Sequence, residues 1–592
     1  MDKANVFEIL IVNHAIEHPT ELQPDSVSSA CVERRLAWVL GLSCLLLLFV
    51  NLGGAALFEP DEGRNAEKAR EILLLNDWVT PHENFLPVMD KPMFFYWLIA
   101  IAYKLFGVSE WSARLPSALA ALGCLCLVYR FAAERWGKRQ ARWSVLILVT
   151  SVEFFLLARI VIFDMTLTFL TTLALFSFYS ALHAPAGQAR RIHCLLMYLA
   201  LGAGTLFKGL VGFVVPGMIF FFYLLCTKRW RSLRELNLLQ GAVIFFAVVA
   251  PWYLWAEARN PGYLRYYFWD EHFTRYLTDE FKRTKSWYYL SLVLAVGFLP
   301  WSAALPVAAK KLWKNLDDRT LFLLLWILLP LAFFSASNSQ LPHYILPIFP
   351  ALAILVGHTI VESLEEAGAK ISGTVYYSWA ISAGFVLYLS IGLLWPQLLA
   401  REIRSAVVEN GLFVTLSTLA LLILYGVYAL CADRYRHFKQ RAIFPCSIVG
   451  MTVFFLLVGQ IKENAADQRT AKTLADAAAP FISPDSQIVL FNTYVTGLPF
   501  YLRIDRPIWI VNPKGKSTLM GSPYVSRMLP APAPGHGKVL FNIEEFAASW
   551  AQNERPFRVF LKARNVSQLN DQVATATSEL VRVDEHVLVT KR

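Results

Sequence analysis

Long apolar runs recur along most of this 592-residue chain, and they limit its possible folds more than any other feature. About twenty consecutive apolar residues are enough to cross a hydrocarbon layer roughly 30 Å thick. Charged residues make up only 17% of the chain, where a soluble protein has about a quarter. We predict about thirteen spans, at residues 35–57, 113–133, 143–162, 165–182, 194–207, 210–226, 237–256, 287–308, 320–335, 344–362, 376–395, 411–431 and 442–460. The chain is therefore predicted to be a mainly α-helical, polytopic membrane protein.

Basic clusters in the connections predict how these spans are oriented. Clusters at 135–142, 228–234, 310–314 and 434–441 all fall on the side of the N-terminal tail, residues 1–34. Because cytoplasmic loops collect Lys and Arg, that side is expected to be cytoplasmic. The net charge of +11 then reflects membrane topology, and we predict no nucleic-acid partner. An odd number of spans places the chain beyond residue 461 outside the cytoplasm.

The composition changes to that of a small soluble domain near residue 471. Apolar, β-branched runs alternate with helical patterns, which favours an α/β domain at 462–592. The expected strands are 487–491, 507–511, 557–561 and a closing pair within 579–590, with helices at 471–481 and 542–552. The preceding residues, 35–461, form the predicted transmembrane catalytic domain.

Two connections on the outer side are too long and too polar to be simple turns, namely 58–112 and 257–286. The first carries a dense set of charges directly after the first span, and a short apolar helix at 93–106 is expected to lie at the membrane interface. Dense charge at a bilayer surface indicates a site that handles a charged group. The alternative, which we favour for most of these charges, is the polar face of a solvated amphipathic helix at 63–75.

Ionisable residues at the rims of spans are costly and tend to be functional. Under this topology, four such places lie at the outer interface: Arg159 with Asp164, Lys208, the segment 270–275, and Gln340 with His343 and Tyr344. Each has a structural alternative. Arg159 and Asp164 would form an ion pair, Lys208 would extend to lipid headgroups, and His343 and Tyr344 would anchor the interface.

Several motifs together resemble a known enzyme class. They are PDEGRNAEKAREIL, DWVTPH, DKPMFFYWLIAIAYKLFG, SARLPSALAAL, FFSASNSQLPHYILPIFPALA and GLPFYLR. The chain resembles the GT-C glycosyltransferases that use polyprenyl-phosphate sugars, and within them the bacterial lipid A aminoarabinose transferases, relatives of the protein O-mannosyltransferases. It departs from their usual pattern at Asp90, where a glutamate is usual, and at Gln340, where a lysine is common.

The resemblance implies a set of site residues. Asp61 is the first candidate for the catalytic carboxylate, with Asp164 and Glu62 beside it. A phosphate leaving group requires cations around it, and arginine offers a planar fork to phosphate oxygens. The candidates for binding the donor phosphate are Lys91, Arg64, Arg159, Lys208 and Arg275. Tyr344, His343 and Gln340 are expected in the substrate pocket, and Asp90, Glu271 and His272 are candidate ligands of a divalent metal, the one cofactor considered.

The implied activity is an inverting transfer of a sugar from an undecaprenyl-phosphate carrier to lipid A, on the periplasmic face of the bacterial inner membrane. A protein or another glycan is the alternative acceptor. A transporter or flippase of lipid-linked sugars is the alternative from another class. Transporters of that kind place buried charges near the midplane within repeats, and this sequence shows no internal repeat.

Overall fold

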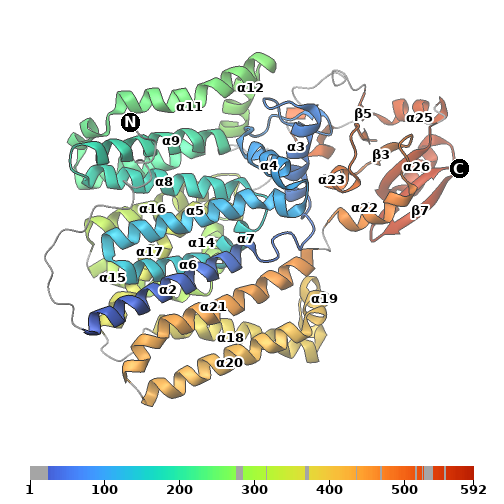
Figure 1. The fold of residues 1–592 in the computed structure, drawn as a ribbon. Coiled ribbons are helices and arrows are strands. Elements are labelled where there is room, and N and C mark those ends of the chain that lie inside the picture. The colour runs from blue at the N-terminus through green and yellow to red at the C-terminus, as the bar shows by residue number, and fades with distance from the viewer. Residues whose placement is uncertain are drawn as a thin grey trace.

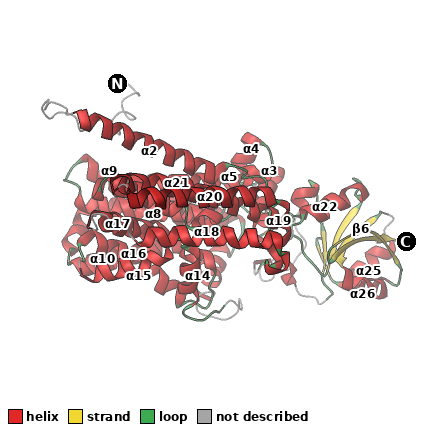
Figure 2. Ribbon diagram, turned by 90° about the horizontal axis from the view of Figure 1, so that it is seen from below, coloured by secondary structure: helices red, strands yellow, loops and turns green. Residues whose placement is uncertain are grey.

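Helices fill the chain up to residue 466, and every strand longer than two residues lies beyond it (Figures 1 and 2). The computed structural model describes residues 24–274, 284–314, 316–366, 373–434, 436–466, 470–513, 517–522, 524–525, 538–552 and 555–592. The strands are confined to the end of the molecule that carries the C-terminus (Figure 2). A helical membrane part followed by an α/β domain is the predicted fold class, which is confirmed.

The long helices follow the apolar runs of the sequence. They are α2 (Pro24–Phe49), α5 (Glu110–Trp136), α6 (Lys138–Val149), α7 (Val152–Ala158), α8 (Phe163–His183), α9 (Gln188–Lys208), α10 (Val211–Thr227), α11 (Leu238–Arg259), α14 (Tyr289–Gly297), α15 (Leu305–Lys314), α16 (Asp318–Ser335), α17 (Phe349–Glu366), α18 (Gly373–Leu394), α20 (Gly411–Arg434) and α21 (Arg436–Ala466). Eight of the described helices are long and apolar enough to cross a membrane, and two bent pairs bring the number to ten. The count of thirteen stays a prediction.

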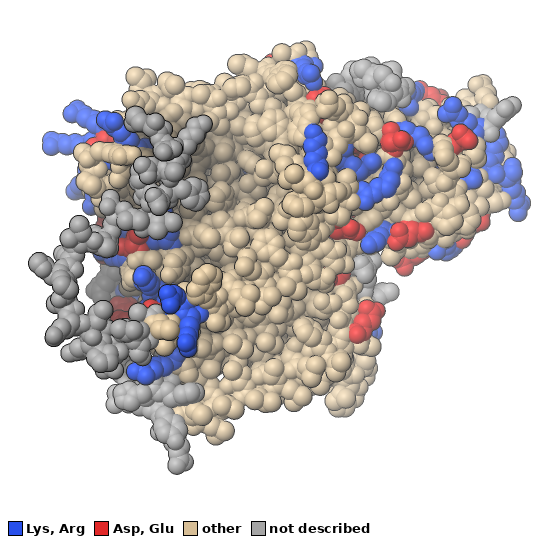
Figure 3. All heavy atoms as spheres, viewed as in Figure 1, with Lys and Arg blue, Asp and Glu red and all other residues tan. Residues whose placement is uncertain are grey.

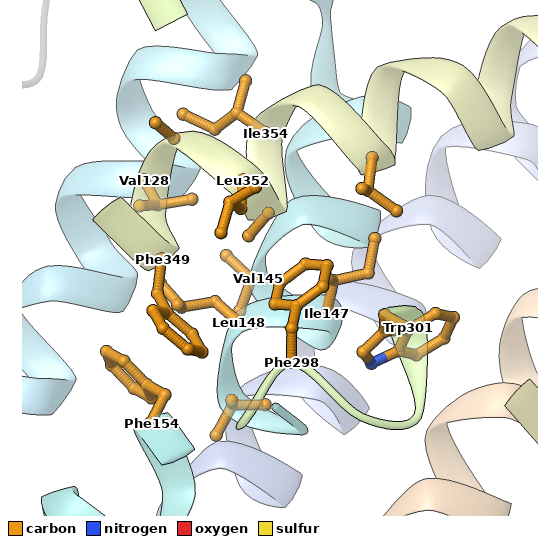
Figure 4. Packing of buried hydrophobic residues seen from close by; sticks show 14 of the residues in the cluster. Val128, Val145, Ile147, Leu148, Phe154, Phe298, Trp301, Phe349, Leu352 and Ile354 are labelled. Carbon is orange, nitrogen blue, oxygen red and sulfur yellow. The ribbon is translucent and has the colours of Figure 1, made fainter. Parts of the chain in front are cut away.

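The centre of the helical part is packed around α6 and α17 (Figure 4). Val145 and Leu148 of α6 face Phe349 and Leu352 of α17, and all four are buried. Trp301 closes this core and donates a hydrogen bond from Nε1 to Thr150, 3.0 Å away. The chain bends by 68° between α6 and α7, and α7 keeps Phe154 in this core while its Leu156 and Leu157 reach the cavity described below.

Charge is distributed unevenly along the molecule (Figure 3). Lys and Arg side chains gather at the end of the helical part remote from the C-terminal domain, and both signs of charge cover that domain. A broad surface of uncharged residues separates the two ends, as a span through lipid requires. The protein is therefore a multi-pass membrane protein.

Shorter elements gather at the end of the bundle that faces the C-terminal domain (Figure 1). They are α3 (Asp61–Leu75), the hairpin β1–β2 (His82–Glu83 and Leu86–Pro87), α4 (Phe94–Phe106), α12 (Tyr263–Arg265), the π-helix η2 (Tyr266–Thr274) and α19 (Arg401–Glu409). Helices α3 and α4 share a core with α8, α9 and α11, in which Tyr96 and Tyr253 are buried.

The C-terminal domain is a six-stranded sheet in the order β5-β4-β3-β6-β8-β7. The strands are β3 (Gln487–Phe491), β4 (Trp509–Val511), β5 (Leu540–Phe541), β6 (Phe557–Lys562), β7 (Thr577–Val583) and β8 (His586–Lys591). The first four pair in parallel and the last two are antiparallel. The sequence did not predict β5, which has only two residues.

Helices cover both faces of this sheet. From β3, Val489 packs on the side of α25 (Ile543–Gln552) and α26 (Val566–Val573), and Leu490 packs on the side of α22 (Lys472–Ala478). Burial on both faces explains why β3 is a continuous apolar run rather than an alternating one.

The C-terminal domain is bound tightly to the loop at 58–112. Asn84 donates to the carbonyl of Ile508 at 2.7 Å and accepts from its N–H at 2.8 Å. Glu59 accepts hydrogen bonds from the N–H groups of Thr496 and Gly497, at 2.9 and 2.7 Å. A Cβ added at Gly63 would lie 2.9 Å from the backbone of Gly497, so the two backbones are in direct contact. The predicted boundary at 461/462 falls inside α21.

Candidate active site

A cavity of about 820 Å³ lies where the bundle meets the C-terminal domain, and it collects most of the predicted site residues. The cations that line it are Arg64, Lys68, Lys91, Arg114, Lys208 and Lys462, and the carboxylates are Asp61, Glu62, Asp90, Asp164 and Glu271. His343 and Tyr344 complete the polar wall. Residues from the first polar loop, the ends of α5, α8, α9 and α21, the segment before α17 and the segment after α12 therefore converge on one space.

Helix α3 provides the largest share of this wall. Positions three and four apart lie on one face of a helix, and Asp61, Arg64 and Lys68 follow that spacing and line the cavity. The charges on the other side of α3 are also buried: Glu67 is 1% exposed and Glu71 is 0% exposed. The interpretation of this segment as a solvated amphipathic helix is therefore wrong, because the C-terminal domain covers the face that the sequence assigns to water.

Glu83 of β1 fixes two of the cavity cations. Its carboxylate lies 3.0 Å from Nε of Arg64 and 3.2 Å from Nζ of Lys68. Arg64 also donates to the carbonyl of Met520, 2.7 Å away in the C-terminal domain. Burial lowers the pKa of Lys68, but Tyr96 and the Glu83 carboxylate outweigh it and the net pKa is raised. The ammonium group therefore stays charged in a site shielded from water.

Asp61 and Glu62 are adjacent but differ in what they contact. The two oxygens of Glu62 accept from Nε and Nη2 of Arg114, both at 2.9 Å, and from the N–H groups of Phe58 and Val161. Burial raises the pKa of Glu62, but the Arg114 guanidinium outweighs it and the net pKa is lowered. In the described part of the chain, Asp61 has no hydrogen-bond or ion-pair partner. Glu62 is consequently a structural anion, and Asp61 is the carboxylate available to a substrate.

Asp164 and Lys208 form an ion pair at the cavity wall, from the first turn of α8 and the last turn of α9. Nζ of Lys208 lies 4.7 Å from the centre of the Tyr344 ring, and Nε2 of His343 lies 3.7 Å from Asp164. Lys208 therefore points to the cavity rather than to lipid headgroups. The alternative of an ion pair between Arg159 and Asp164 is not observed, because each has another partner.

Lys91 and the candidate metal ligands form a further group of polar side chains at the cavity. Nζ of Lys91 lies 3.9 Å from Glu271, and Asp90 accepts from the Tyr266 hydroxyl at 2.8 Å. Nδ1 of His272 lies 2.7 Å from the carbonyl of Tyr267, and its Nε2 accepts from the N–H of Leu210 at 3.2 Å. Within the described residues, no three His, Cys, Asp or Glu side chains are arranged to hold a metal. The metal site stays a prediction, and the mechanism below does not use it.

Three predicted residues do not line the cavity. Arg159 is paired with Glu463 and donates to the carbonyls of Leu47 and Val50, both at 2.8 Å. The Gln340 amide donates to the carbonyls of Ser335 and Ser337, at 2.9 and 3.1 Å, at the end of α16. These contacts occupy the Arg159 guanidinium and the Gln340 NH₂ group, whereas Oε1 of Gln340 is buried without a hydrogen-bond partner among the described residues. The third residue is His272, and Arg275 lies outside the described residues.

The sequence analysis did not predict four residues that line the cavity or orient its cations: Lys68, Glu83, Arg114 and Lys462. Lys68 was assigned to the solvated face of α3, and Glu83 belongs to a two-residue strand without a sequence pattern of its own. Arg114 and Lys462 carried a usable signal, because each is a charge at the end of an apolar run. Arg114 also donates to the carbonyls of Leu52, Ala55 and Ala56, so it holds the end of the first predicted span.

Most of the remaining cavity lining is apolar. It includes Leu156 and Leu157 of α7, Ile160 just after α7, Phe385 of α18, Ile403 of α19, and Val458 and Ile461 of α21. A cavity with a cationic end and an apolar side matches an amphipathic ligand whose head is an anion.

Comparison with known proteins agrees with this geometry. Residues 90–255 match the family model described as dolichyl-phosphate-mannose-protein mannosyltransferase. The undecaprenyl phosphate-α-4-amino-4-deoxy-L-arabinose arabinosyl transferase of Pseudomonas paraeruginosa is 33% identical over 410 residues, covering 68% of this chain and 72% of that protein. The chain belongs to this arabinosyl transferase family. Its namesake from Aeromonas hydrophila is 35% identical over 56% of this chain and 60% of its own length.

A solved structure extends the likeness to nearly the whole arabinosyl transferase fold. The crystal structure of ArnT from Cupriavidus metallidurans bound to undecaprenyl phosphate has a TM-score of 0.80 and 26% identity, over 94% of this chain and 97% of that one. The same protein in the apo state gives a TM-score of 0.79. The match includes both the helical part and the C-terminal domain, and the resemblance drawn from the motifs is confirmed.

Proposed function

We propose that this protein transfers 4-amino-4-deoxy-L-arabinose from an undecaprenyl phosphate carrier to lipid A. The observation that supports it most is the single cavity in which fixed cations, an unpaired carboxylate and an apolar wall meet. The relatives named above are transferases of that sugar from that carrier. The protein is thus a polyprenyl-phosphate-sugar glycosyltransferase of the membrane.

The bond that breaks joins the sugar C1 to an oxygen of the carrier phosphate. Its electron pair leaves with the phosphate, and an acceptor oxygen forms the new bond to C1 from the opposite side. Catalysis is expected to come from stabilising this growing negative charge. Lys91 and the ion-paired Lys208 both line the cavity, and Arg64 and Lys68 are already oriented by Glu83. Little reorganisation is needed when the leaving group becomes an anion.

Asp61 acts on the sugar side of this step. When the acceptor is a hydroxyl, a carboxylate must take its proton. A phosphate acceptor such as that of lipid A is already an anion and requires little base catalysis. A 4-amino sugar carries an ammonium group at neutral pH, and the unpaired Asp61 carboxylate is its natural partner. Asp61 then holds the sugar in position, and Asp164 orients Lys208.

The site is proposed to face the periplasm across the bacterial inner membrane. Basic connections place the opposite end in the cytoplasm. A reporter that is active only outside the cytoplasm should be silent when fused after Lys314 and active when fused after Arg592. Activity at the first position with silence at the second reverses the proposed orientation.

A direct test uses the purified full-length protein in lipid, with the undecaprenyl-phosphate aminosugar as donor. Lipid A should gain one aminoarabinose, detected by mass spectrometry, and cells lacking the gene should lose that modified species. Transfer to a protein or another glycan, with lipid A unmodified, identifies the alternative acceptor. Movement of the intact lipid-linked sugar across the membrane without transfer identifies the transporter alternative.

A further inference from the structure

A second group of charges lies at the cavity wall, and the cations Lys91 and Lys208 are not part of it. It comprises Glu62, Arg114, Arg159, Glu463 and Lys462, from α3, α5, the turn after α7, and α21. Two ion pairs account for four of these side chains, Glu62 with Arg114 and Arg159 with Glu463. The fifth residue, Lys462, belongs to neither pair, so the group carries one net positive charge.

Lys462 has no ion-pair or hydrogen-bond partner in the part of the chain that the structure describes. The charges that act on it are Glu62 and Glu463, each already paired, and the two arginines. Its side chain lines the cavity. The two glutamates offset only part of the desolvation cost of this cation, because each is already paired with an arginine, so an anionic ligand is the missing partner.

The neighbours of Lys462 indicate what kind of anion this is. Val458 and Ile461 line the cavity from the same helix, one turn before Lys462 and directly next to it. Phe385 and Ile403 continue the apolar wall from α18 and α19. The ligand head therefore meets Lys462 while its hydrocarbon lies along these residues. This is the chemistry of a lipid phosphate.

The transfer requires two lipid phosphates in one cavity, that of the donor carrier and that of the acceptor. The cations fixed by Glu83, Glu271 and Asp164 form one set, on α3, the loop at 91 and α9. We infer that Lys462 is the binding residue for the phosphate of the lipid acceptor, and that the end of α21 with α18 and α19 receives the acceptor's acyl chains. This inference rests on the proposed function.

The same charge balance predicts a separation of effects on binding and on stability. Lys462→Met replaces an uncompensated cation by an apolar side chain of similar length and leaves both ion pairs intact. Removal of such a charge is neutral or stabilising. A structural lysine would behave in the opposite way, because its removal would lower the melting temperature.

The experiment compares wild type, Lys462→Met and Lys462→Arg as full-length enzymes in lipid nanodiscs. Lys472→Met is the matched control, since Lys472 pairs with Glu110 outside the cavity. The KM for lipid A should rise about tenfold or more in Lys462→Met, the loss expected for one charge-assisted contact to phosphate. Binding of undecaprenyl phosphate should stay within about twofold, and the melting temperature should be unchanged or higher. Lys462→Arg should keep most of the acceptor affinity.

Three results overturn the inference: weakened undecaprenyl phosphate binding with an unchanged KM for lipid A, no change in either quantity, or a lower melting temperature with a parallel loss of activity. The first assigns Lys462 to the donor phosphate and the third gives it a structural role. The wild-type measurement distinguishes a failure of this inference from a failure of the proposed function. Absence of any transfer to lipid A by the wild type refutes the function, whereas equal KM values for wild type and Lys462→Met refute only the inference.

Discussion

Helix α3 has two charged faces that serve different purposes. On one face, Asp61, Arg64 and Lys68 line the cavity. On the other, both carboxylate oxygens of Glu67 accept from Arg70 at 2.7 Å, and Arg70 also donates to the carbonyl of Ile504 in the C-terminal domain. The first face presents charge to a ligand, and the second binds two parts of the protein together. Burial alone therefore does not identify a catalytic charge; the presence or absence of a protein partner does.

The sharpest test of the cavity face is Asp61→Asn, which keeps the size and removes the negative charge. Turnover should fall by about 10²-fold, because the aminosugar loses the charge that holds it in position for attack. Binding of undecaprenyl phosphate and the melting temperature should change little, because Asp61 has no partner among the described residues. Single-turnover transfer measures the first quantity and equilibrium binding the second. Glu110→Gln, a carboxylate outside the cavity, is the control, and near-normal turnover in Asp61→Asn would remove Asp61 from the mechanism.

A substitution on the face of α3 that contacts the C-terminal domain should lower stability and leave turnover nearly unchanged. Arg70→Met leaves Glu67 and the Ile504 carbonyl without their partner, and breaking a buried pair in this way costs about 3–5 kcal/mol of unfolding free energy. Thermal unfolding of the purified protein should show the loss. Activity per folded molecule should be retained at low temperature. Arg582→Met removes a fully exposed arginine and serves as control; equal stability of the two variants would contradict the comparison.

Lys91→Ala extends the comparison to a cavity cation outside α3. Donor binding should weaken by about 10–100-fold, since a charge-assisted contact to phosphate acts in the ground state as well as in the transition state. Turnover should fall too. Lys104 lies in the same polar loop, with Nζ 4.8 Å from the Trp78 ring, and does not line the cavity. Lys104→Ala should bind undecaprenyl phosphate normally, and equal donor affinity in both variants would exclude Lys91 from the phosphate site.

The smallest effect is expected from Glu71→Gln on the non-catalytic face. Burial, and then the Glu67 carboxylate, raise the pKa of Glu71 well above its usual range. The folded protein thus holds this proton more tightly than the unfolded chain, so unfolding free energy falls as pH rises above about 4.3, the usual value for glutamate. Glu71→Gln should remove part of that slope and raise stability at pH 8 by at most about 1–2 kcal/mol. An unchanged slope between pH 5 and 8 would show that Glu71 is ionised when folded.

Composition and motifs predicted much of this structure. The apolar runs predicted the helices because a chain that spans lipid has few alternatives to a helix. The position of Asp164 and Lys208 at the ends of spans predicted that they belong to the site. The error on α3 has a physical cause. A segment with charges on all sides resembles a solvated helix, and nothing within its own residues shows that another domain covers it. The roles of Glu83 and Met520 could not be predicted for the same reason, because they arise only from contacts between segments that are distant in the sequence.

The contact between the α3 region and the C-terminal domain can form only after most of the chain has been synthesised. Glu59 and Thr496 are 437 positions apart in the chain, and a ribosome adds about 5–20 residues per second. The loop that begins the cavity thus waits roughly 20–90 seconds for the segment that covers it. During that interval the part of α3 that the C-terminal domain covers lies open, and Arg64 lacks its contact with Met520. Completion of the active site is therefore one of the last events in the biogenesis of this protein.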